Sequence, residues 1–172
     1  MPAVFPFQAL QYQDGSGDVS SLVAPPYDVL GLEARDALRA RDARNVVTVD
    51  LPHVPAKELG PPEAYSTAAS TFRSWIDQGV LTKRQAPAMF AYRQTFEFMG
   101  TPYRRHGMAA TVETVPFGPR DGGGVLPHEQ TFSGPKEDRF ALMKATAAQL
   151  SPIFGLHADE QGQATRLLQK IM

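Results

Sequence analysis

PEAYSTAASTFRSWIDQG, residues 62–79, carries the clearest helical periodicity in the chain. Proline opens it, as it often does at the first helical position, and Gly79 lies just past its end. Its apolar residues recur every three to four positions, at Tyr65, Ala69, Phe72 and Ile76, with Trp75 beside them. We therefore expect a helix from Pro62 to Gln78 with one buried face.

The next stretch, MFAYRQTFEFM at residues 89–99, alternates instead. Its aromatic residues fall on one face of an extended strand and its polar residues on the other, which is the pattern of a half-buried strand. Gly100, Thr101 and Pro102 then turn the chain, and residues 103–115 return it. The sequence predicts a β-hairpin whose aromatic face belongs to the core.

The remaining elements complete an α+β fold. Helical patterns cover residues 32–43, 135–150 and 163–172, and strand patterns cover residues 46–51 and 153–156. In the helix at 135–150 the predicted buried stripe consists of Phe140, Met143, Ala147 and Leu150. The β-branched run at 46–51 stops at Pro52, as strands often do. The order predicts a mixed sheet with a β-hairpin and flanking helices, and 172 residues suffice for a single domain, 1–172.

Composition excludes several classes of function. Seventeen basic against eighteen acidic residues give no general attraction to nucleic acid or to an anionic membrane. The absence of cysteine excludes thiolate metal sites and cysteine nucleophiles. No apolar run approaches the roughly 20 residues that span a bilayer, and the N-terminus does not read as a signal peptide. We expect a soluble cytoplasmic protein that does not bind nucleic acid or membrane.

The candidate chemistry lies in TFSGPKEDR, residues 131–139. With Gly134 as N-cap and Pro135 as the first helical residue, free backbone N–H groups gather where a helix begins, and they favour an anion. Lys136 adds a mobile charge and Arg139 a guanidinium fork one turn later. The predicted phosphate-binding residues are Thr131, Ser133, Gly134, Lys136 and Arg139.

Acidic and imidazole side chains precede this helix. Glu129 is the candidate general base, since a carboxylate within reach of a hydroxyl takes its proton during phosphoryl transfer. His128 is the second catalytic candidate, as a group that orients Glu129 or contacts phosphate. Asp28, its neighbour Tyr27, and Asp138 are candidates for binding substrate or Mg²⁺, with no dedicated metal cluster expected.

Structural interpretations stand beside each of these functional ones. Ser-Gly-Pro followed by charged residues also begins an ordinary surface helix. The Pro25–Asp28 loop can be a turn in which Asp28 caps the following helix. Arg104, Arg105 and His106 fit a solvated strand face, and His53 and His157 lie in loops without an assigned role.

Several motifs together resemble one family. In order and spacing, this chain is similar to the bacterial and archaeal family called domain of unknown function 1015, over nearly its whole length. The segments that carry the resemblance are Val23–Val29, Asn45–Val47, Leu126–Thr131, Gly134–Arg139 and Leu150–Leu156. Members of that family are more than twice as long, so the resemblance implies an N-terminal portion of a longer protein.

The family in turn resembles, distantly, the ParB and sulfiredoxin superfamily, which includes kinases of free serine. That resemblance implies a partly ParB/sulfiredoxin-like fold, with Gly134, Lys136 and Arg139 on nucleotide phosphates and Glu129 assisting a hydroxyl nucleophile. Gln130 stands where the family often has arginine, and the sulfiredoxin cysteine has no counterpart here.

Three hypotheses of function follow. The first is a phosphotransferase that uses ATP or ADP with Mg²⁺ on a small hydroxylated metabolite, with free serine as the leading candidate. The second is a non-catalytic, regulatory nucleotide-binding module built on the same residues. DNA binding is the third and is disfavoured by the neutral charge.

Overall fold

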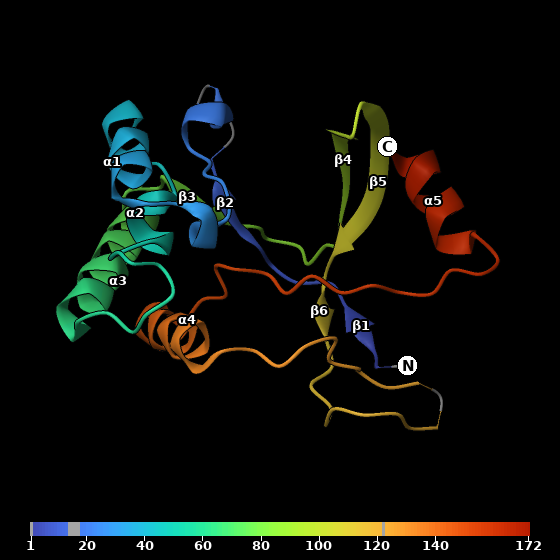
Figure 1. Ribbon diagram of the computed structural model, residues 1–172. Helices are drawn as coiled ribbons and strands as arrows, with labels where there is room; N and C mark the ends of the chain where they lie inside the picture. Colours follow the sequence, from blue (N-terminus) through green and yellow to red (C-terminus); the bar gives the residue numbers. More distant parts are fainter. Residues whose placement is uncertain (1, 14–17, 122) are drawn as a thin grey trace. The chain divides into compact units, whose positions relative to one another are not determined.

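The computed structural model describes residues 2–13, 18–121 and 123–172, which form two compact units. The helical unit comprises residues 10–82 and 129–153, and the hairpin unit comprises residues 1–9, 83–128 and 154–172. The helical unit is therefore built from two stretches that the hairpin unit separates along the chain (Figure 1). The single domain expected from the sequence stays a prediction.

The helical unit contains four α-helices, a pair of short strands and two 3-10 turns. The helices are α1 (Leu32–Arg41), α2 (Val47–Asp50), α3 (Pro62–Asp77) and α4 (Ser133–Thr146). The paired strands are β2 (Leu10–Tyr12) and β3 (Leu81–Lys83), and the turns are η1 (Val19–Ser21) and η2 (Tyr27–Val29). The expected helices at residues 32–43, 62–78 and 135–150 are confirmed with shifted ends.

One face of α3 forms the centre of the core. Its buried residues are Tyr65, Ala68, Ala69, Phe72 and Trp75. Leu142 of α4 and Val49 of α2 belong to the same cluster. Each large apolar side chain that is fully buried contributes roughly 1.5–3 kcal/mol to folding, so this face holds α2 and α4 in place. The predicted face is confirmed except at Ile76, which is exposed.

The buried face of α4 differs from the predicted one. The sequence favoured a stripe that included Phe140 and Met143, but both side chains are exposed. The helix instead buries Asp138, Leu142 and Thr146, which are four residues apart and so share one side. A carboxylate therefore occupies a core position, which sequence periodicity alone does not anticipate.

The predicted strand at residues 46–51 is wrong, because this segment forms the helical turn α2. Asn45 is fully buried, and its side-chain oxygen accepts a hydrogen bond from Val47 N at 3.0 Å. Its amide nitrogen donates to Ser21 O and Val23 O, both at 2.8 Å. These three bonds tie the start of the segment to a loop and stabilise a turn, so tertiary contacts override the β-propensity of valine.

The hairpin unit contains the other described elements. They are β1 (Val4–Phe5), β4 (Phe90–Phe98), β5 (Thr101–Ala109), β6 (Thr111–Val112) and α5 (Gln163–Ile171). β4 pairs with β5 and β1 pairs with β6, both antiparallel. Met99 and Gly100 both have positive φ, at 50° and 75°, which is the backbone of a tight two-residue hairpin turn. The predicted hairpin and the last helix are confirmed.

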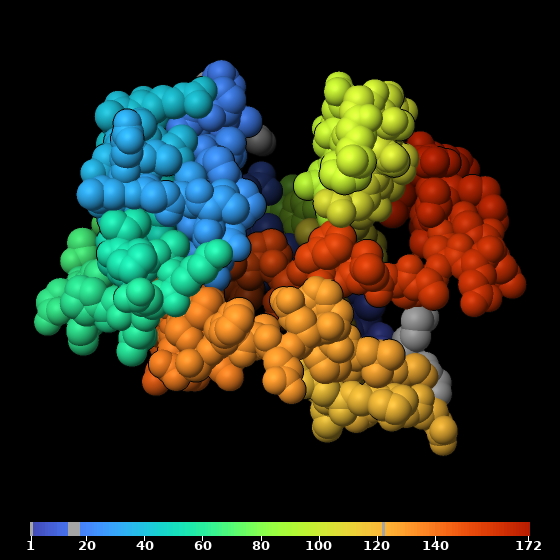
Figure 2. All heavy atoms as spheres, viewed as in Figure 1, coloured from blue at the N-terminus to red at the C-terminus, as the bar shows by residue number. Residues whose placement is uncertain are grey.

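Two sequence expectations fail in this unit. The described strands form three separate two-stranded sheets, so there is no single mixed sheet among them. Phe96 and Phe98 are exposed rather than in the core, because the sheet under them has only two strands. Figure 2 shows this hairpin standing beside α5, which contacts β5.

The predicted strand at residues 153–156 does not form either. Ile153 is 91% exposed and Leu156 is 90% exposed, so nothing buries the apolar side chains that suggested a strand.

No helix within the described ranges is both long enough and apolar enough to cross a membrane.

Candidate active site

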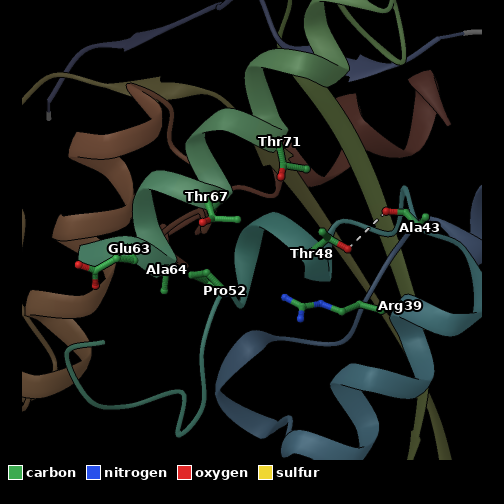
Figure 3. Close-up of a pocket in the computed structure, with 9 residues that line it drawn as sticks. Arg39, Ala43, Thr48, Pro52, Glu63, Ala64, Thr67 and Thr71 are labelled. Carbon is green, nitrogen blue, oxygen red and sulfur yellow. Dashed lines mark hydrogen bonds between the residues drawn. The ribbon is translucent and has the colours of Figure 1, made fainter. Parts of the chain in front are cut away.

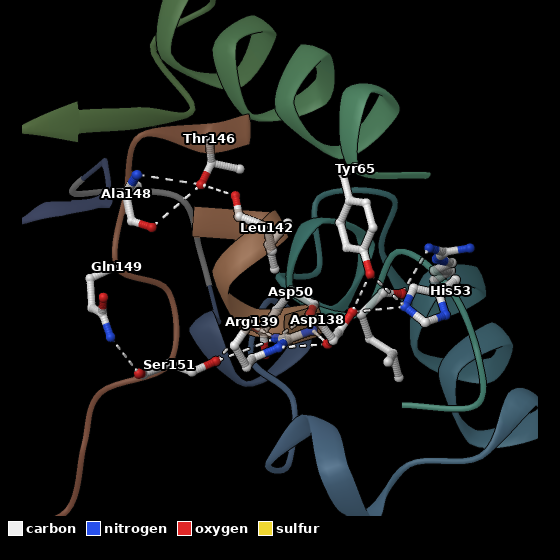
Figure 4. A network of polar contacts seen from close by, with 12 residues as sticks. Asp50, His53, Tyr65, Asp138, Arg139, Leu142, Thr146, Ala148, Gln149 and Ser151 are labelled. Atoms are coloured by element: carbon white, nitrogen blue, oxygen red, sulfur yellow. Dashed lines mark hydrogen bonds and ion pairs between the residues drawn. The ribbon is translucent and has the colours of Figure 1, made fainter. Parts of the chain in front are cut away.

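A buried carboxylate, Asp138, organises the polar centre of the helical unit. Its side chain has no exposed surface, and both of its oxygens accept hydrogen bonds (Figure 4). Oδ1 lies 2.8 Å from His53 Nε2 and accepts the Tyr65 hydroxyl at 2.6 Å. Oδ2 accepts from Arg139 Nε at 2.9 Å and from its terminal nitrogen at 2.7 Å. A carboxylate buried in this way needs such compensation, and here every oxygen receives it.

Backbone also packs against His53. It follows α2 in a loop, and the α-carbon of Gly60 packs directly against its ring. Gly60 N also donates to the Tyr65 hydroxyl at 2.7 Å, which ties the loop to α3. With its proton on Nε2 toward Asp138, the ring presents a lone pair on Nδ1, which has no hydrogen bond to any described residue. A carboxylate behind an imidazole fixes its orientation and tautomer, as in sites of general-base catalysis.

Arg139 links this centre to two other segments. Its guanidinium donates to Asp50 Oδ1 at 3.1 Å and to the Asp50 carbonyl at 2.8 Å. Ser151 Oγ donates to the same Asp50 oxygen at 3.1 Å. The guanidinium carbon also lies 3.8 Å from the centre of the Tyr27 ring, a cation–π contact. Two carboxylates and one aromatic ring thus fix Arg139.

Burial shifts the acid–base behaviour of this network. It raises the pKa of Tyr65 to about 12, and the hydrogen bond to Asp138 acts in the same direction. Burial also raises the pKa of Asp50, while the charge of Arg139 acts against that rise. The phenol of Tyr65 therefore stays protonated near neutral pH and serves as a hydrogen-bond donor.

The start of α4 adjoins the same centre. Its N-cap, Phe132, makes no side-chain capping bond, and no acidic side chain stands in the first turn. The backbone of the His53 loop reaches this turn, since a β-carbon on Gly134 would lie 2.5 Å from the Lys57 carbonyl oxygen. Lys136 is exposed here, as is Lys57. N–H groups without a side-chain cap therefore lie at the beginning of α4, beside Lys136 and the backbone of Lys57.

Only some of the predicted site residues belong to the polar network around Asp138. The helix begins two residues earlier than expected, so Gly134 is its second residue rather than its N-cap. Thr131 and Ser133 are exposed just before and at the helix start. Glu129 belongs to the helical unit, whereas His128 belongs to the hairpin unit.

Of the residues expected to bind substrate or Mg²⁺, Tyr27 and Asp138 join the network through Arg139, and Asp28 is exposed in η2. Asp28 does not cap α1, because Gly31 is the N-cap of that helix. Asp138 does not fit the role of a Mg²⁺ ligand, since both oxygens already accept bonds from His53, Tyr65 and Arg139. In the part of the chain that the structure describes, no three acidic or histidine side chains gather as a metal site.

Sequence reasoning missed His53, Tyr65 and Asp50. The helical periodicity of residues 62–78 indicates only a core position for Tyr65, and no motif includes His53 or Asp50. The partner of His53 lies 85 residues away in the sequence, so no local spacing signals the pair. The adjacent Asp138 and Arg139, on a helix predicted to be partly buried, were the one available sign of a buried ion pair.

The helical unit is thus an α-helical scaffold around a buried Asp–His–Tyr–Arg centre, next to an uncapped helix start. The chain belongs to a protein family of unknown function, DUF1015, whose model matches residues 4–172. Neither the curated proteins nor the solved structures gave a match.

Proposed function

We propose that this protein is a nucleotide-dependent phosphotransferase that acts on a small hydroxylated metabolite, with free serine as the first candidate. The observation that carries the proposal is the His53–Asp138 pair, an imidazole held against a buried carboxylate on the helix whose start is uncapped. ATP or ADP would be the phosphate donor. Its phosphates would lie on the first N–H groups of α4, with Lys136 and Lys57 beside them.

The spacing along α4 supports one site that both binds the nucleotide phosphates and takes the proton of the acceptor hydroxyl. Asp138 lies five positions after Ser133, the first residue of α4. At a rise of about 1.5 Å per residue, they are roughly 7–8 Å apart along the helix axis. A phosphate at the helix start would therefore lie within the length of a small acceptor molecule from His53.

The reaction needs one proton acceptor. The acceptor hydroxyl gives its proton to Nδ1 of His53, its oxygen forms a bond to the terminal phosphorus, and the bond to the nucleotide breaks with its electron pair on the departing phosphate. Asp138 stabilises the imidazolium that results, and Tyr65 and Arg139 hold Asp138 in place. Glu129 remains the second candidate for this role. Mg²⁺ would arrive bound to the nucleotide phosphates, since Asp138 is already fully engaged.

Two further expectations belong to the proposal. Motif resemblance supports a distant relationship of this fold to the ParB and sulfiredoxin superfamily. A kinase of a free metabolite also fits the cytoplasm, where nucleotides and such substrates are found together.

The proposed activity is tested by looking directly for the phosphorylated product. The protein is incubated with Mg²⁺, with ATP or ADP, and with serine or other hydroxylated metabolites, and phosphorylated product is detected by ³¹P NMR. His53→Gln should abolish turnover while leaving nucleotide affinity unchanged, and Glu129→Gln should leave turnover if His53 is the base. His106→Gln is the matched control in the hairpin unit.

Nucleotide binding is tested separately. Lys136→Ala should weaken it, whereas Lys144→Ala, in the last turn of the same helix, should not. Nucleotide binding without product for any acceptor would favour the alternative, a non-catalytic regulatory nucleotide-binding module. No effect of Lys136→Ala on nucleotide affinity would remove α4 from both accounts.

A further inference from the structure

A groove of about 510 Å³ lies between α1, α2 and α3 of the helical unit (Figure 3). Arg39 of α1 reaches into it, and Thr67 and Thr71 face it from successive turns of α3. Pro52 and Ala64 provide apolar surface between them. The lining of the groove therefore combines one cationic side chain, hydroxyl groups and a small apolar surface.

Arg39 is a cation without an anionic partner. Its terminal nitrogen donates to the Leu51 carbonyl at 3.3 Å, and it forms no ion pair with any described residue. Its Nε is buried and lacks a hydrogen bond, and it is the one buried side-chain nitrogen or oxygen in this condition within the described ranges. Leaving such a donor unsatisfied is costly, so Arg39 lacks part of the compensation that a buried guanidinium needs.

The charges near Arg39 also favour the binding of an anion. Asp36, whose charge acts to raise the pKa of Arg39, is itself paired with Arg35 at 3.0 Å. Burial lowers the pKa of Arg39, and the charge of Arg35 acts in the same direction. The surroundings of Arg39 therefore disfavour its charge in the absence of an anion.

The rest of the lining limits which anion fits. A guanidinium fork matches the two oxygens of a carboxylate, and Thr67 and Thr71 supply further hydroxyl donors. Next to Pro52 and Ala64, a ligand is better accommodated with a few methylene groups than with a second charged group. Glu63 also lines the groove and would repel a dianion.

We infer that this groove binds a small organic monocarboxylate, with the carboxylate on the Arg39 guanidinium and the hydrocarbon part on Pro52 and Ala64. The inference does not depend on phosphoryl transfer, because it uses none of the residues assigned to that reaction.

Butyrate is the probe for the test, with butyramide as its uncharged analogue and inorganic phosphate as the competing anion. The full chain is labelled with ¹⁵N in a buffer free of carboxylate and phosphate, and the Nε–H signal of Arg39 is followed during each titration. Butyrate should shift this signal in a saturable manner, and butyramide should not. Calorimetry on the same samples gives the affinities.

Two variants on the same helix sharpen the result. Arg39→Met keeps an apolar stem of similar length and removes the charge, so it should weaken butyrate binding about tenfold or more. Arg41→Met removes an exposed arginine that hydrogen-bonds to Ser20 and does not line the groove, so it should leave butyrate binding unchanged.

The inference is overturned if butyrate leaves the Arg39 signal unmoved, or if Arg39→Met binds butyrate as well as the parent chain. Tighter binding of phosphate than of butyrate would also overturn it. If Arg39→Met fails to fold, the titration of the Arg39 signal in the parent chain still decides.

Discussion

The α-carbon of Gly60 lies so close to the ring of His53 that a β-carbon there would be 2.6 Å from Nε2. The same nitrogen lies 2.8 Å from Asp138 Oδ1. Backbone packed against the ring and a buried carboxylate at Nε2 therefore fix the imidazole. This arrangement makes Gly60 as important for the position of His53 as Asp138 is.

Gly60→Ala should displace His53 or the loop that carries it. Inserting a methyl group into a closely packed position costs about 1–3 kcal/mol, which chemical denaturation would measure as a lower free energy of unfolding. Gly155→Ala is the control, since a β-carbon on Gly155 would meet nothing within 4 Å. Equal stability of both variants would show that the contact with His53 is not maintained in solution.

Asp138→Asn should be far more damaging than Glu137→Gln on the same helix. The first change leaves Arg139 and His53 facing an uncharged group in a buried position, and breaking such a pair costs about 3–5 kcal/mol. Glu137 is exposed, and changes of this kind on a surface stay within about 0.5 kcal/mol. Thermal unfolding monitored by circular dichroism compares the two, and similar midpoints would contradict the buried network.

Alkaline pH should reveal the protected tyrosines. The pKa of Tyr65 and that of Tyr12 are both raised to about 12, with burial as the largest cause. Both residues ionise near 10 when the chain is unfolded, so their contribution to stability is complete below pH 10 and is lost between pH 10 and 12. Ultraviolet titration of Tyr65→Phe should lack part of the late absorbance rise that the parent chain shows. A rise completed near pH 10 in the parent chain would refute the burial of both phenols.

Asn45→Ala should destabilise the helical unit by about 3 kcal/mol, because it removes three hydrogen bonds and leaves two carbonyl groups without their donor. Gln78→Ala is the control, since its side chain is exposed and bonds only to Ser74 one turn earlier. Urea denaturation measures both variants. A loss below about 1 kcal/mol for Asn45→Ala would mean that water or other groups replace the amide readily.

The sequence predicts elements well where one pattern agrees with its surroundings. The helix α3 begins at Pro62 and ends one residue before the expected Gln78, because proline, glycine and a continuous apolar face all favour the same limits. The hairpin follows from strict alternation and a tight turn. Both are local patterns, and local patterns are what a sequence displays directly.

Prediction failed where distant contacts decide. Valine favours a strand, yet the buried amide of Asn45 makes a turn of Val47–Asp50. In α4 the buried residue is Asp138 rather than Phe140, since His53 and Arg139 compensate its charge. The sequence predicts a candidate site at the start of this helix with His128 as its imidazole, whereas the imidazole in the buried network is that of His53. The residues that flank His53 and His128 in the sequence do not indicate which of the two histidines has a buried carboxylate as its partner.

The division of the helical unit into residues 10–82 and 129–153 affects how it is made on the ribosome. Asp138 is synthesised 85 residues after His53, and at 5–20 residues per second this interval lasts roughly 4–17 seconds. During that time α3 has emerged while the helix that should cover its apolar face has not. The nascent chain therefore presents Phe72 and Trp75 to the cell until α4 follows, and this delay exposes it to chaperones at each round of translation.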